Sequence, residues 1–523
     1  MNRKVFASIL SWTILLLLAQ TSMAKGPYGD RKYRRMGIHN GNLVATIFFN
    51  QGDISGWAGW GYPPPRCEWP KGSGHEYSGE NSILVAAEVV DIHGKTIHIL
   101  SESSLDFDST DKNPEGYQQG WEPIPGYFNP YQDSPAMSHK PETWPEFWPD
   151  KLDSPDDPGW RGINLQTGED PDPNRAAWNG YFGKGVMQAD QESYFAFDDN
   201  ANDEFEFYPD STDSTRRGLG LLVRARGLQW SHVLAEDCIF WLYDITNVGT
   251  YNHTKMVFGE VFDSFMGGFG DENDDCAYFD QTGDMDITYS WDYNGVGAGG
   301  WSPVGYFGFA FLESPGDATD GIDNDEDGLV DERRDSGPGE YIFGPVGKYG
   351  SPKWHWSGDE DGDWVGFTDI NGNGLWDTED TNNNGILDPV EDINRNGILD
   401  YEPLNDDLGM DGIGPESPNY PGPDQGQGDG IPTDGEPHFD KTDVDESDQI
   451  GLTSMESHEE NSIYLAYDEA IWDLMKPGHF APIAQATNTE FIYGSGYFPL
   501  LPGKTERFSL ALVMGEDFND IIR

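Results

Sequence analysis

The amino-acid sequence predicts a mainly β protein, built of antiparallel β-sandwich domains that a long acidic segment interrupts. Short runs rich in Val, Ile, Phe, Tyr and Trp recur along the chain, and Gly, Asn, Asp and Pro separate them, as in strands joined by turns. Helix signals are nearly absent, and frequent Pro residues exclude helix interiors from the N-terminal part. The 18 Trp, 24 Tyr and 28 Phe supply enough apolar surface for sizeable cores in a chain of 523 residues.

Residues 1–24 are expected to form a secretory signal peptide. Arg3 and Lys4 give it a positive start, residues 9–18 give it an apolar core, and Ser22-Met23-Ala24 is a small-x-small cleavage site. The apolar core is about ten residues long, whereas a membrane-spanning helix needs roughly 20. We therefore expect an exported chain, secreted or held at the cell surface, with no membrane insertion after cleavage.

Four segments follow the signal peptide. Residues 25–192 are rich in Gly, Pro and Trp and are expected to form a β domain, and residues 193–315 are expected to form a β-sandwich. Residues 316–450 are acidic, and residues 451–523 return to a strand pattern. The expected strands are Leu43–Phe49, Ser82–Val90, Lys95–Leu100, Leu219–Arg226, Cys238–Thr246, Lys255–Asp263, Tyr306–Leu312, Ser462–Tyr467, Glu490–Gly494 and Thr505–Val513.

The C-terminal segment, 451–523, is expected to complete the sandwich rather than to fold by itself. It holds too few strands to close a core, and an isolated hairpin is only marginally stable in water. Thr505–Val513 should therefore pair with the strands between Cys238 and Asp263. The last residues, 516–523, resemble the start of a helix, and we expect the chain to be part of a longer protein.

The formal net charge of −62 limits the partners that the chain can bind. A nucleic acid or an anionic membrane would be repelled, whereas divalent cations are the natural counter-charge. Residues 316–450 contain 36 acidic and 6 basic residues, so almost half of the net charge lies in about a quarter of the chain. Apolar residues are sparse there, and this segment cannot bury a core of its own.

The chain has three cysteines, Cys67, Cys238 and Cys276. An exported protein of this size with so few cysteines is not a disulfide scaffold. A Cys238–Cys276 bridge and a buried free thiol at Cys238 both remain open.

A repeated pattern of oxygen-bearing residues lies in the acidic segment. Calcium takes about six to eight oxygens, and a tight loop supplies them from positions 1, 3, 5, 7, 9 and 12, with Gly at position 6. Residues 380–391 match every position and 369–380 nearly so, whereas 392–403 ends in Pro403 and a separate copy, 323–334, ends in Arg334. The expected ligands are Asp323, Asp325, Asp327, Leu329 and Asp331 in the separate copy, and Asp369, Asn371, Asn373, Leu375, Asp377, Asp380, Asn382, Asn384, Ile386, Asp388, Glu391, Asp392, Asn394, Asn396, Ile398 and Asp400 in the tandem loops.

An acidic, solubilising linker is the alternative interpretation of this segment. Three tandem loops and a fourth copy favour calcium, because chance rarely repeats an alternating oxygen pattern closed by Gly and a hydrophobic residue. Residues 359–363, 406–411, 429–436 and 440–448 lack the full spacing and are expected to be plain loop. Asn at positions 3 and 5 lowers the loop charge, which predicts weak binding of about 10⁻⁴–10⁻³ M, as in extracellular modules. The expected fold class is thus mainly β, with antiparallel β-sandwich domains and a long acidic calcium-loop insertion.

The tandem loops start at Asp369, Asp380 and Asp392, which leaves no room for the flanking helices of paired EF-hands. They resemble the calcium loops of thrombospondin type 3 repeats and, less closely, of dockerin modules, over about residues 317–402. This resemblance implies that ions replace a hydrophobic core. The wider layout, with "ENSILVAAEVVD", "YDITNVGT" and "GYFGFAFLESPGDATDGIDNDEDGLVDE", is similar to large uncharacterised secreted proteins of Gram-negative bacteria. Those proteins often end in a type IX secretion sorting domain, which this sequence does not contain, and the similarity implies a surface location without a particular reaction.

Motifs of common enzyme classes are missing from the sequence, which has no nucleophile elbow, His-Glu-x-x-His, phosphate loop or dinucleotide fingerprint. The preferred hypothesis is a secreted or cell-surface calcium-binding structural or adhesive protein without catalysis. The alternative is an extracellular polysaccharide-binding or polysaccharide-degrading protein. A groove with two convergent carboxylates and exposed Trp would favour this alternative. Candidate sugar-stacking residues, for which core and turn packing is the preferred interpretation, are Trp57, Trp60, Trp69, Trp144 and Trp148.

Overall fold

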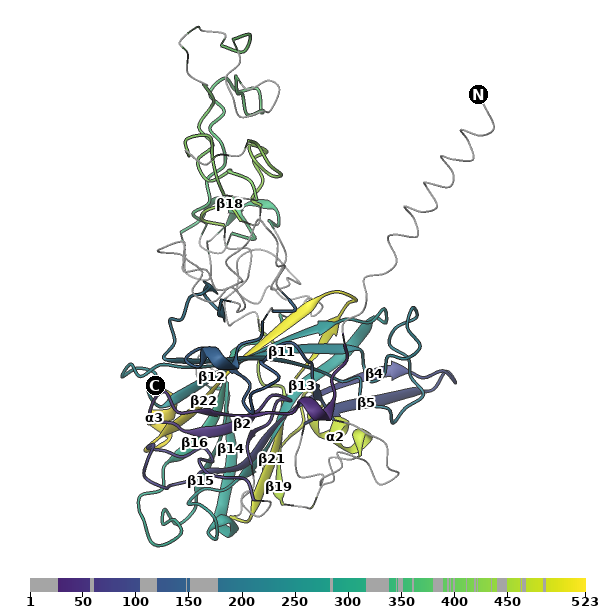
Figure 1. Ribbon diagram of the computed structural model, residues 1–523, viewed down its shortest axis with the longest axis vertical. Helices are drawn as coiled ribbons and strands as arrows, with labels where there is room; N and C mark the ends of the chain where they lie inside the picture. Colours follow the sequence, from purple (N-terminus) through teal and green to yellow (C-terminus); the bar gives the residue numbers. More distant parts are fainter. Residues whose placement is uncertain are drawn as a thin grey trace.

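The computed structural model describes residues 27–523 with internal gaps. The gaps are 57–60, 104–119, 147, 151–176, 283–285, 317–337, 345, 347–350, 360–361, 380–388, 393–394, 396, 398–399, 411, 418–419, 421, 434, 440–448, 461, 463–466 and 483–485. The described residues form two large, mostly antiparallel sheets that pack face to face, which confirms the expected mainly β sandwich (Figure 1). The expected signal peptide, residues 1–24, lies outside the described residues.

The first sheet has nine strands in the order β1-β2-β3-β4-β13-β21-β19-β20, with β5 beside β4. Its centre is β4-β13-β21, where Phe258 lies opposite Val85 on one side and Ser495 on the other. The strands are β1 (Met36–His39), β2 (Thr46–Phe49), β3 (Ile54–Ser55), β4 (Ser78–Val90), β5 (Thr96–Glu102), β13 (His253–Ser264), β19 (Ser454–Glu459), β20 (Phe480–Ala481) and β21 (Thr489–Leu500).

The second sheet also has nine strands, in the order β14-β15-β16-β22-β12-β11-β10-β6, with β7 beside β10. They are β6 (Glu122–Pro123), β7 (Ala136–Met137), β10 (Gln191–Asp198), β11 (Leu221–Gln229), β12 (Cys238–Asn247), β14 (Asp275–Asp280), β15 (Ile287–Asp292), β16 (Tyr306–Glu313) and β22 (Thr505–Gly515). The segments expected as two domains, 25–192 and 193–315, thus contribute neighbouring strands to both sheets.

The C-terminal strand β22 lies between β12 and β16 in the second sheet. Cys238 is paired with Val513 and Thr246 with Thr505, so the expectation that these strands share a sheet is confirmed. In the sequence, β16 precedes residues 316–450, β19 and β22 follow them, and all three strands belong to the two large sheets.

The core lies between the two sheets and is dominated by aromatic side chains. Phe258 of the first sheet stacks on Phe508 of the second, with their ring centroids 4.1 Å apart. Phe48 of the first sheet likewise stacks on Phe195 of the second and contacts Trp241 edge-on. Each fully buried side chain of this size stabilises the fold by about 1.5–3 kcal/mol relative to an exposed one, so the sandwich has its own source of stability.

A short helix, α2 (Asp468–Met475), covers the outer face of the first sheet. Strand β13 alternates, so Phe258 points to the other sheet while Val257 and Val261 pack under Trp472 of α2. This double burial explains the nearly continuous apolar run in the β13 sequence. The strand expected at Ser462–Tyr467 falls mostly outside the described residues, and Tyr467 is the N-cap of α2.

The smaller elements are 3-10 turns, short hairpins and a terminal helix. They are η1 (Arg31–Tyr33), η4 (Pro141–Thr143), η6 (Glu272–Asp274), β8 (Asn179–Gly180), β9 (Gly183–Lys184), β17 (Tyr341–Gly344), β18 (Lys353–Trp356) and α3 (Phe518–Ile521). Cys67, Cys238 and Cys276 are free thiols, and burial raises the pKa of Cys67 to about 12. Within the described parts of the chain, no helix is both long and apolar enough to cross a membrane.

Candidate metal centre

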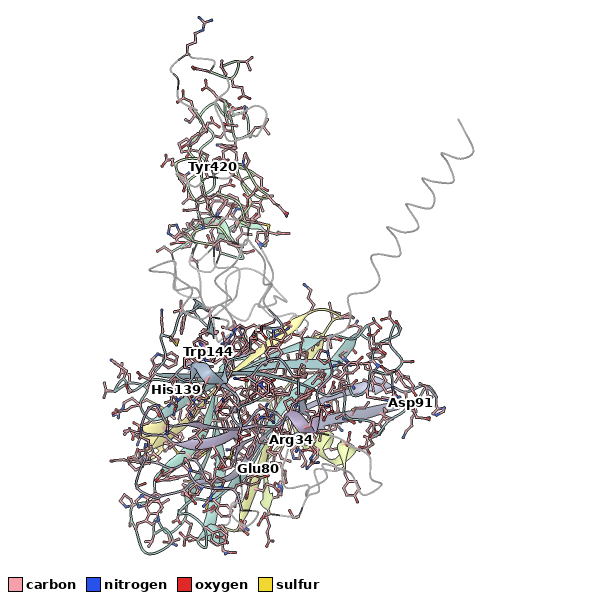
Figure 2. All side chains as sticks on the ribbon, viewed as in Figure 1. Arg34, Glu80, Asp91, His139, Trp144 and Tyr420 are labelled. Atoms are coloured by element: carbon pink, nitrogen blue, oxygen red, sulfur yellow. The ribbon has the colours of Figure 1, made fainter. Side chains whose placement is uncertain are left out.

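The described part of the acidic segment stands apart from the two sheets in Figure 1, at the position of β18. Tyr420, labelled in Figure 2, belongs to it. It consists of turns and the β17–β18 hairpin, and several of its apolar side chains are exposed, among them Val390 and Ile370. Its order therefore depends on polar contacts, and carboxylates that accept backbone hydrogen bonds are the recurring feature.

Asp369, at position 1 of the first tandem loop, organises the backbone of that loop. Its Oδ1 accepts hydrogen bonds from the backbone N of Gly372 (2.6 Å) and Asn373 (3.1 Å), and its Oδ2 accepts one from Gly374 N (2.6 Å). Gly372 and Gly374 have φ angles of +75° and +76°, which Gly adopts without strain. The bond from Gly374 is the main reason that the pKa of Asp369 lies below its usual range.

The side chains at positions 3, 5 and 9 of this loop converge. Asn371 Oδ1 accepts a hydrogen bond from Asn373 N (3.0 Å), and Asn373 Oδ1 accepts one from Leu375 N (2.7 Å). Both Asn amides donate to Asp377 Oδ2, with 2.9 Å from Asn373 Nδ2. The expected ligands at positions 3, 5 and 9 are thus joined by side-chain hydrogen bonds at Asp377, and the position-1 carboxylate binds the backbone of the same loop.

The third tandem loop repeats the hydrogen bond that closes the first. Asp392 Oδ2 accepts a hydrogen bond from Gly397 N (3.0 Å), as Asp369 does from the equivalent glycine. Gly397 has a φ angle of +76°, so the backbone at position 6 has the same conformation in both loops. Among the described residues, the two loops therefore share this hydrogen bond and the φ angle of the glycine at position 6.

The first and third loops also pair with each other. Glu379 N donates to Asp400 O (2.9 Å), and Glu402 N donates to Asp377 O (2.9 Å), around an antiparallel bridge. The Glu402 carboxylate reaches into the first loop and accepts from the N of Ile370 (2.8 Å) and Asp377 (3.2 Å). Glu379 reaches the other way and accepts from Asp400 N (3.3 Å).

The two cross-linking residues, Glu379 and Glu402, are buried and were not among the expected ligands. The sequence pattern placed the closing carboxylate at position 12, which is Asp380 in the first loop and Pro403 in the third. Both loops instead have Glu at position 11, one residue earlier. The sequence contains these glutamates in "TED" and "YEP". Only the pairing of the loops shows that each one accepts hydrogen bonds from the other loop.

A second group of carboxylates orders the part of the segment that was expected to be plain loop. Asp407 is fully buried and accepts hydrogen bonds from Gly428 N (2.6 Å) and Gly430 N (2.8 Å). Glu436 accepts from Trp364 Nε1 (2.9 Å) and from two backbone N atoms. Burial raises the pKa of Asp407, and it raises that of Glu436 to about 7. The described residues of 406–410 and 429–436 thus lie around buried acids.

Several of the expected ligands lie outside the described residues. Glu391, position 12 of the second loop, is described and buried. The ligands outside the described residues are Asp323, Asp325, Asp327, Leu329, Asp331, Asp380, Asn382, Asn384, Ile386, Asp388, Asn394, Asn396 and Ile398.

The described candidate sugar-stacking tryptophans pack within the fold. Trp148 is buried and donates from Nε1 to Ala177 O (2.7 Å), and Trp144, labelled in Figure 2, donates to Met137 O (2.8 Å). Trp69 donates to Asp237 Oδ1 (2.6 Å). Their indole N–H groups are satisfied internally, which fits core and turn packing. Trp57 and Trp60 lie outside the described residues.

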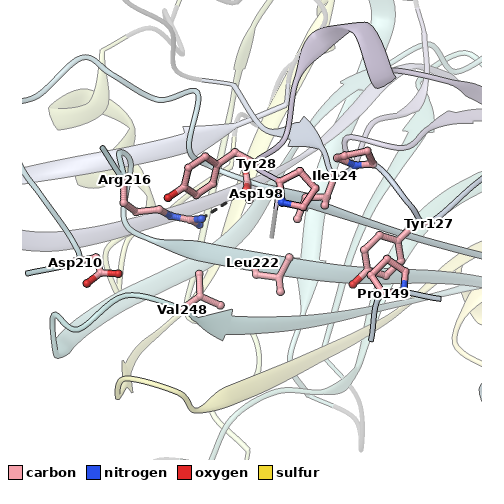
Figure 3. Close-up of a pocket in the computed structure, with 11 residues that line it drawn as sticks. Tyr28, Ile124, Tyr127, Pro149, Asp198, Asp210, Arg216, Leu222 and Val248 are labelled. Atoms are coloured by element: carbon pink, nitrogen blue, oxygen red, sulfur yellow. Dashed lines mark ion pairs between the residues drawn. The ribbon is translucent and has the colours of Figure 1, made fainter. Parts of the chain in front are cut away.

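A cavity of about 480 Å³ lies beside the second sheet (Figure 3). Arg216 contacts two other residues that line the cavity. Its Nη1 lies 3.6 Å from Asp198 Oδ2, and its guanidinium lies over the Tyr28 ring. Burial raises the pKa of Asp198. The described residues that line the cavity are Pro27, Tyr28, Ile124, Pro125, Tyr127, Pro149, Asp198, Asp210, Arg216, Leu222 and Val248.

The tandem loops offer carboxylate, amide and carbonyl oxygens, which are the donors that hard cations such as calcium prefer. The described expected ligands of the first loop, Asp369, Asn371, Asn373 and Asp377, include neither Cys nor His. No family model matches the chain, and no curated protein is detectably similar to it in sequence. Function is therefore inferred from the geometry of the loops and of the sandwich.

Proposed function

We propose that the chain is a secreted or cell-surface calcium-binding protein with a structural or adhesive role. In this proposal, calcium folds and stiffens the acidic segment, and the β-sandwich carries it. The observation that supports this most is that the Asn371 and Asn373 amides meet at Asp377 in the loop whose backbone Asp369 binds. An amide that turns about its last bond presents oxygen instead of nitrogen, so both Asn side chains can exchange their bond to Asp377 for a bond to calcium.

The energetics agree with a folding role for the ion. The acids of residues 316–450 repel one another, and little apolar surface opposes that repulsion. An ion that binds only the folded form stabilises it by about 1.4 kcal/mol when its concentration is roughly tenfold above Kd. Three tandem loops would then contribute about 4 kcal/mol, which is comparable to the stability of a small domain.

Calcium stoichiometry tests this proposal. Equilibrium dialysis at millimolar calcium should show several ions bound per chain, and Asp369→Asn should lower that number. Asp380 ends one loop and begins the next, so Asp380→Asn should remove more calcium than Asp369→Asn. Glu416→Gln removes the same charge from an exposed position of the segment and should leave the number unchanged. A wild-type chain without bound calcium would refute the proposal and leave an acidic linker.

The cavity beside the second sheet favours a second candidate function, which is the binding of an extracellular polysaccharide. Tyr28 and Tyr127 provide ring surface, and Asp198, Asp210 and Arg216 provide hydrogen-bonding groups, which is the mixture that carbohydrate sites use. Calorimetric titration with neutral and acidic oligosaccharides would test it. Binding that Tyr28→Ala weakens at least tenfold would support this function, and no heat with any of the sugars would exclude it.

A further inference from the structure

Three aspartates meet at the edge of the second sheet, far along the chain from the tandem loops. Asp271 and Asp274 lie in the connection between β13 and β14, and Asp292 is the last residue of β15. One carboxylate oxygen from each residue lies within 4.8 Å of the other two. The β14–β15 register pairs Asp275 with Asp292 and so brings the two connections together.

Asp292 is the buried member of this aspartate triad, with 6% of its surface exposed. Its Oδ1 accepts hydrogen bonds from Gly295 N and Val296 N, the latter at 3.3 Å. Its Oδ2 is buried, and so is Oδ2 of Asp271, yet no described group donates a hydrogen bond to either atom. A buried carboxylate oxygen without a donor is costly, because desolvation of the charge is not offset.

The surroundings of the triad are negative. In the described parts of the chain, no Lys, Arg or His forms an ion pair with Asp271, Asp274 or Asp292. Behind the triad, Asp275 is fully buried and its Oδ1 also lacks a donor among the described residues. The chain thus gathers carboxylates here without supplying a positive charge of its own.

We propose that Asp271, Asp274 and Asp292 form a further calcium site, located in the sandwich and independent of the acidic segment. The donors are carboxylate oxygens, which favour a hard divalent cation over zinc or copper. Asp271 and Asp274 are only partly buried, so water can complete the coordination shell. Asn294 already donates from Nδ2 to Asp274 Oδ2 (2.5 Å), and its amide can turn to offer Oδ1 as another ligand.

An ion at this site would tie the β13–β14 connection to the β15–β16 connection. Both connections are long, and they contain Gly-rich stretches such as "MGGFG" and "NGVGAGG". The ion would therefore act as a clamp on a glycine-rich edge of the sandwich, where the backbone loses much entropy on folding.

The variant Asp292→Asn tests the clamp, because Asn keeps an oxygen that can accept the bonds from Gly295 N and Val296 N. Without calcium, the variant should unfold at the same temperature as the wild type or at a higher one, because one uncompensated charge is gone. The increase in unfolding temperature of the sandwich on calcium addition should be lost. Asp280→Asn removes one charge from the other end of the same hairpin and should keep the full calcium effect.

Hydrogen–deuterium exchange of the full chain separates this site from the tandem loops. Calcium should slow exchange in residues 265–275 and 291–301 of the wild type and of Asp369→Asn, but not of Asp292→Asn. Magnesium at the same concentration should give weaker protection, because it demands a tighter octahedral shell. Equal calcium protection of these two stretches in Asp292→Asn and in the wild type would overturn the proposal, whatever the tandem loops bind.

Discussion

The sandwich and the acidic segment differ in the chemical character of the side chains that they bury. In the sandwich, aromatic rings such as Phe258 and Phe508 are fully buried between two sheets. In the acidic segment, the buried centres are carboxylates such as Asp407 and Glu402, and apolar residues such as Leu375 are exposed. The first region gains stability from removing apolar surface from water, and the second from hydrogen bonds to charges that repel each other. Ions should therefore decide whether the acidic segment is ordered, whereas the strands of the sandwich should stay folded without them.

The largest expected effect is on the stability of the sandwich, through its aromatic core. Phe258→Ala removes a ring that stacks on Phe508 in the centre of the core, and should lower the free energy of unfolding by about 3–5 kcal/mol. Urea denaturation followed by tryptophan fluorescence would measure it. The loss should be the same with calcium and with a chelator, and Tyr131→Ala, at a side chain that is 91% exposed, should change little. A loss that vanishes in the chelator would mean that the core depends on calcium.

A buried acid in the same core gives a pH-dependent effect of a few kcal/mol. Burial raises the pKa of Glu260 from 4.5 to about 8, and its Oε2 accepts a hydrogen bond from Tyr493 (2.9 Å). The folded protein therefore holds a proton that the unfolded chain releases above pH 4.5, and stability should fall as the pH rises from about 4.5 to about 8.

Glu260→Gln should remove this contribution, because Gln cannot ionise and still accepts the bond from Tyr493. The variant should gain stability relative to the wild type at pH 8 compared with pH 5, by an amount on the order of a few kcal/mol. Urea denaturation at both pH values would show it. Parallel pH profiles for the two proteins would contradict the assignment of the buried proton to Glu260.

The smallest expected effect is on the calcium affinity of the first tandem loop in the acidic segment. Glu402→Gln leaves one carbonyl oxygen where two carboxylate oxygens now accept bonds from Ile370 N and Asp377 N. Loss of one such bond costs about 1 kcal/mol, so calcium affinity of the first loop should fall roughly fivefold. Calcium titration by calorimetry, with Glu416→Gln as the control, would detect it. An unchanged affinity would show that the pairing of the loops does not support ion binding.

The sequence predicted those features that depend on local spacing. The strands β4, β12, β13 and β22 agree with the prediction to within a few residues, because apolar runs bounded by turn residues report burial directly. The alternating oxygen pattern correctly located a tight loop in which Asp369 accepts a hydrogen bond from the glycine at position 6, whereas its use as a calcium site stays a prediction. The features that it did not predict depend on contacts between distant segments. Glu402 acquires its role from the pairing of two loops, and Asp271 meets Asp292 only through the β14–β15 register.

Limited proteolysis of the full chain, with and without a calcium chelator, tests the central claim most directly. With calcium present, the account predicts that residues 317–448 resist cleavage as well as the sandwich does. After chelation, mass spectrometry should find early cuts throughout that segment, while the strands of both sheets stay intact. Equal resistance of the segment in both conditions, or early cuts in the sheets rather than in the segment, would contradict the claim that calcium holds the acidic region together.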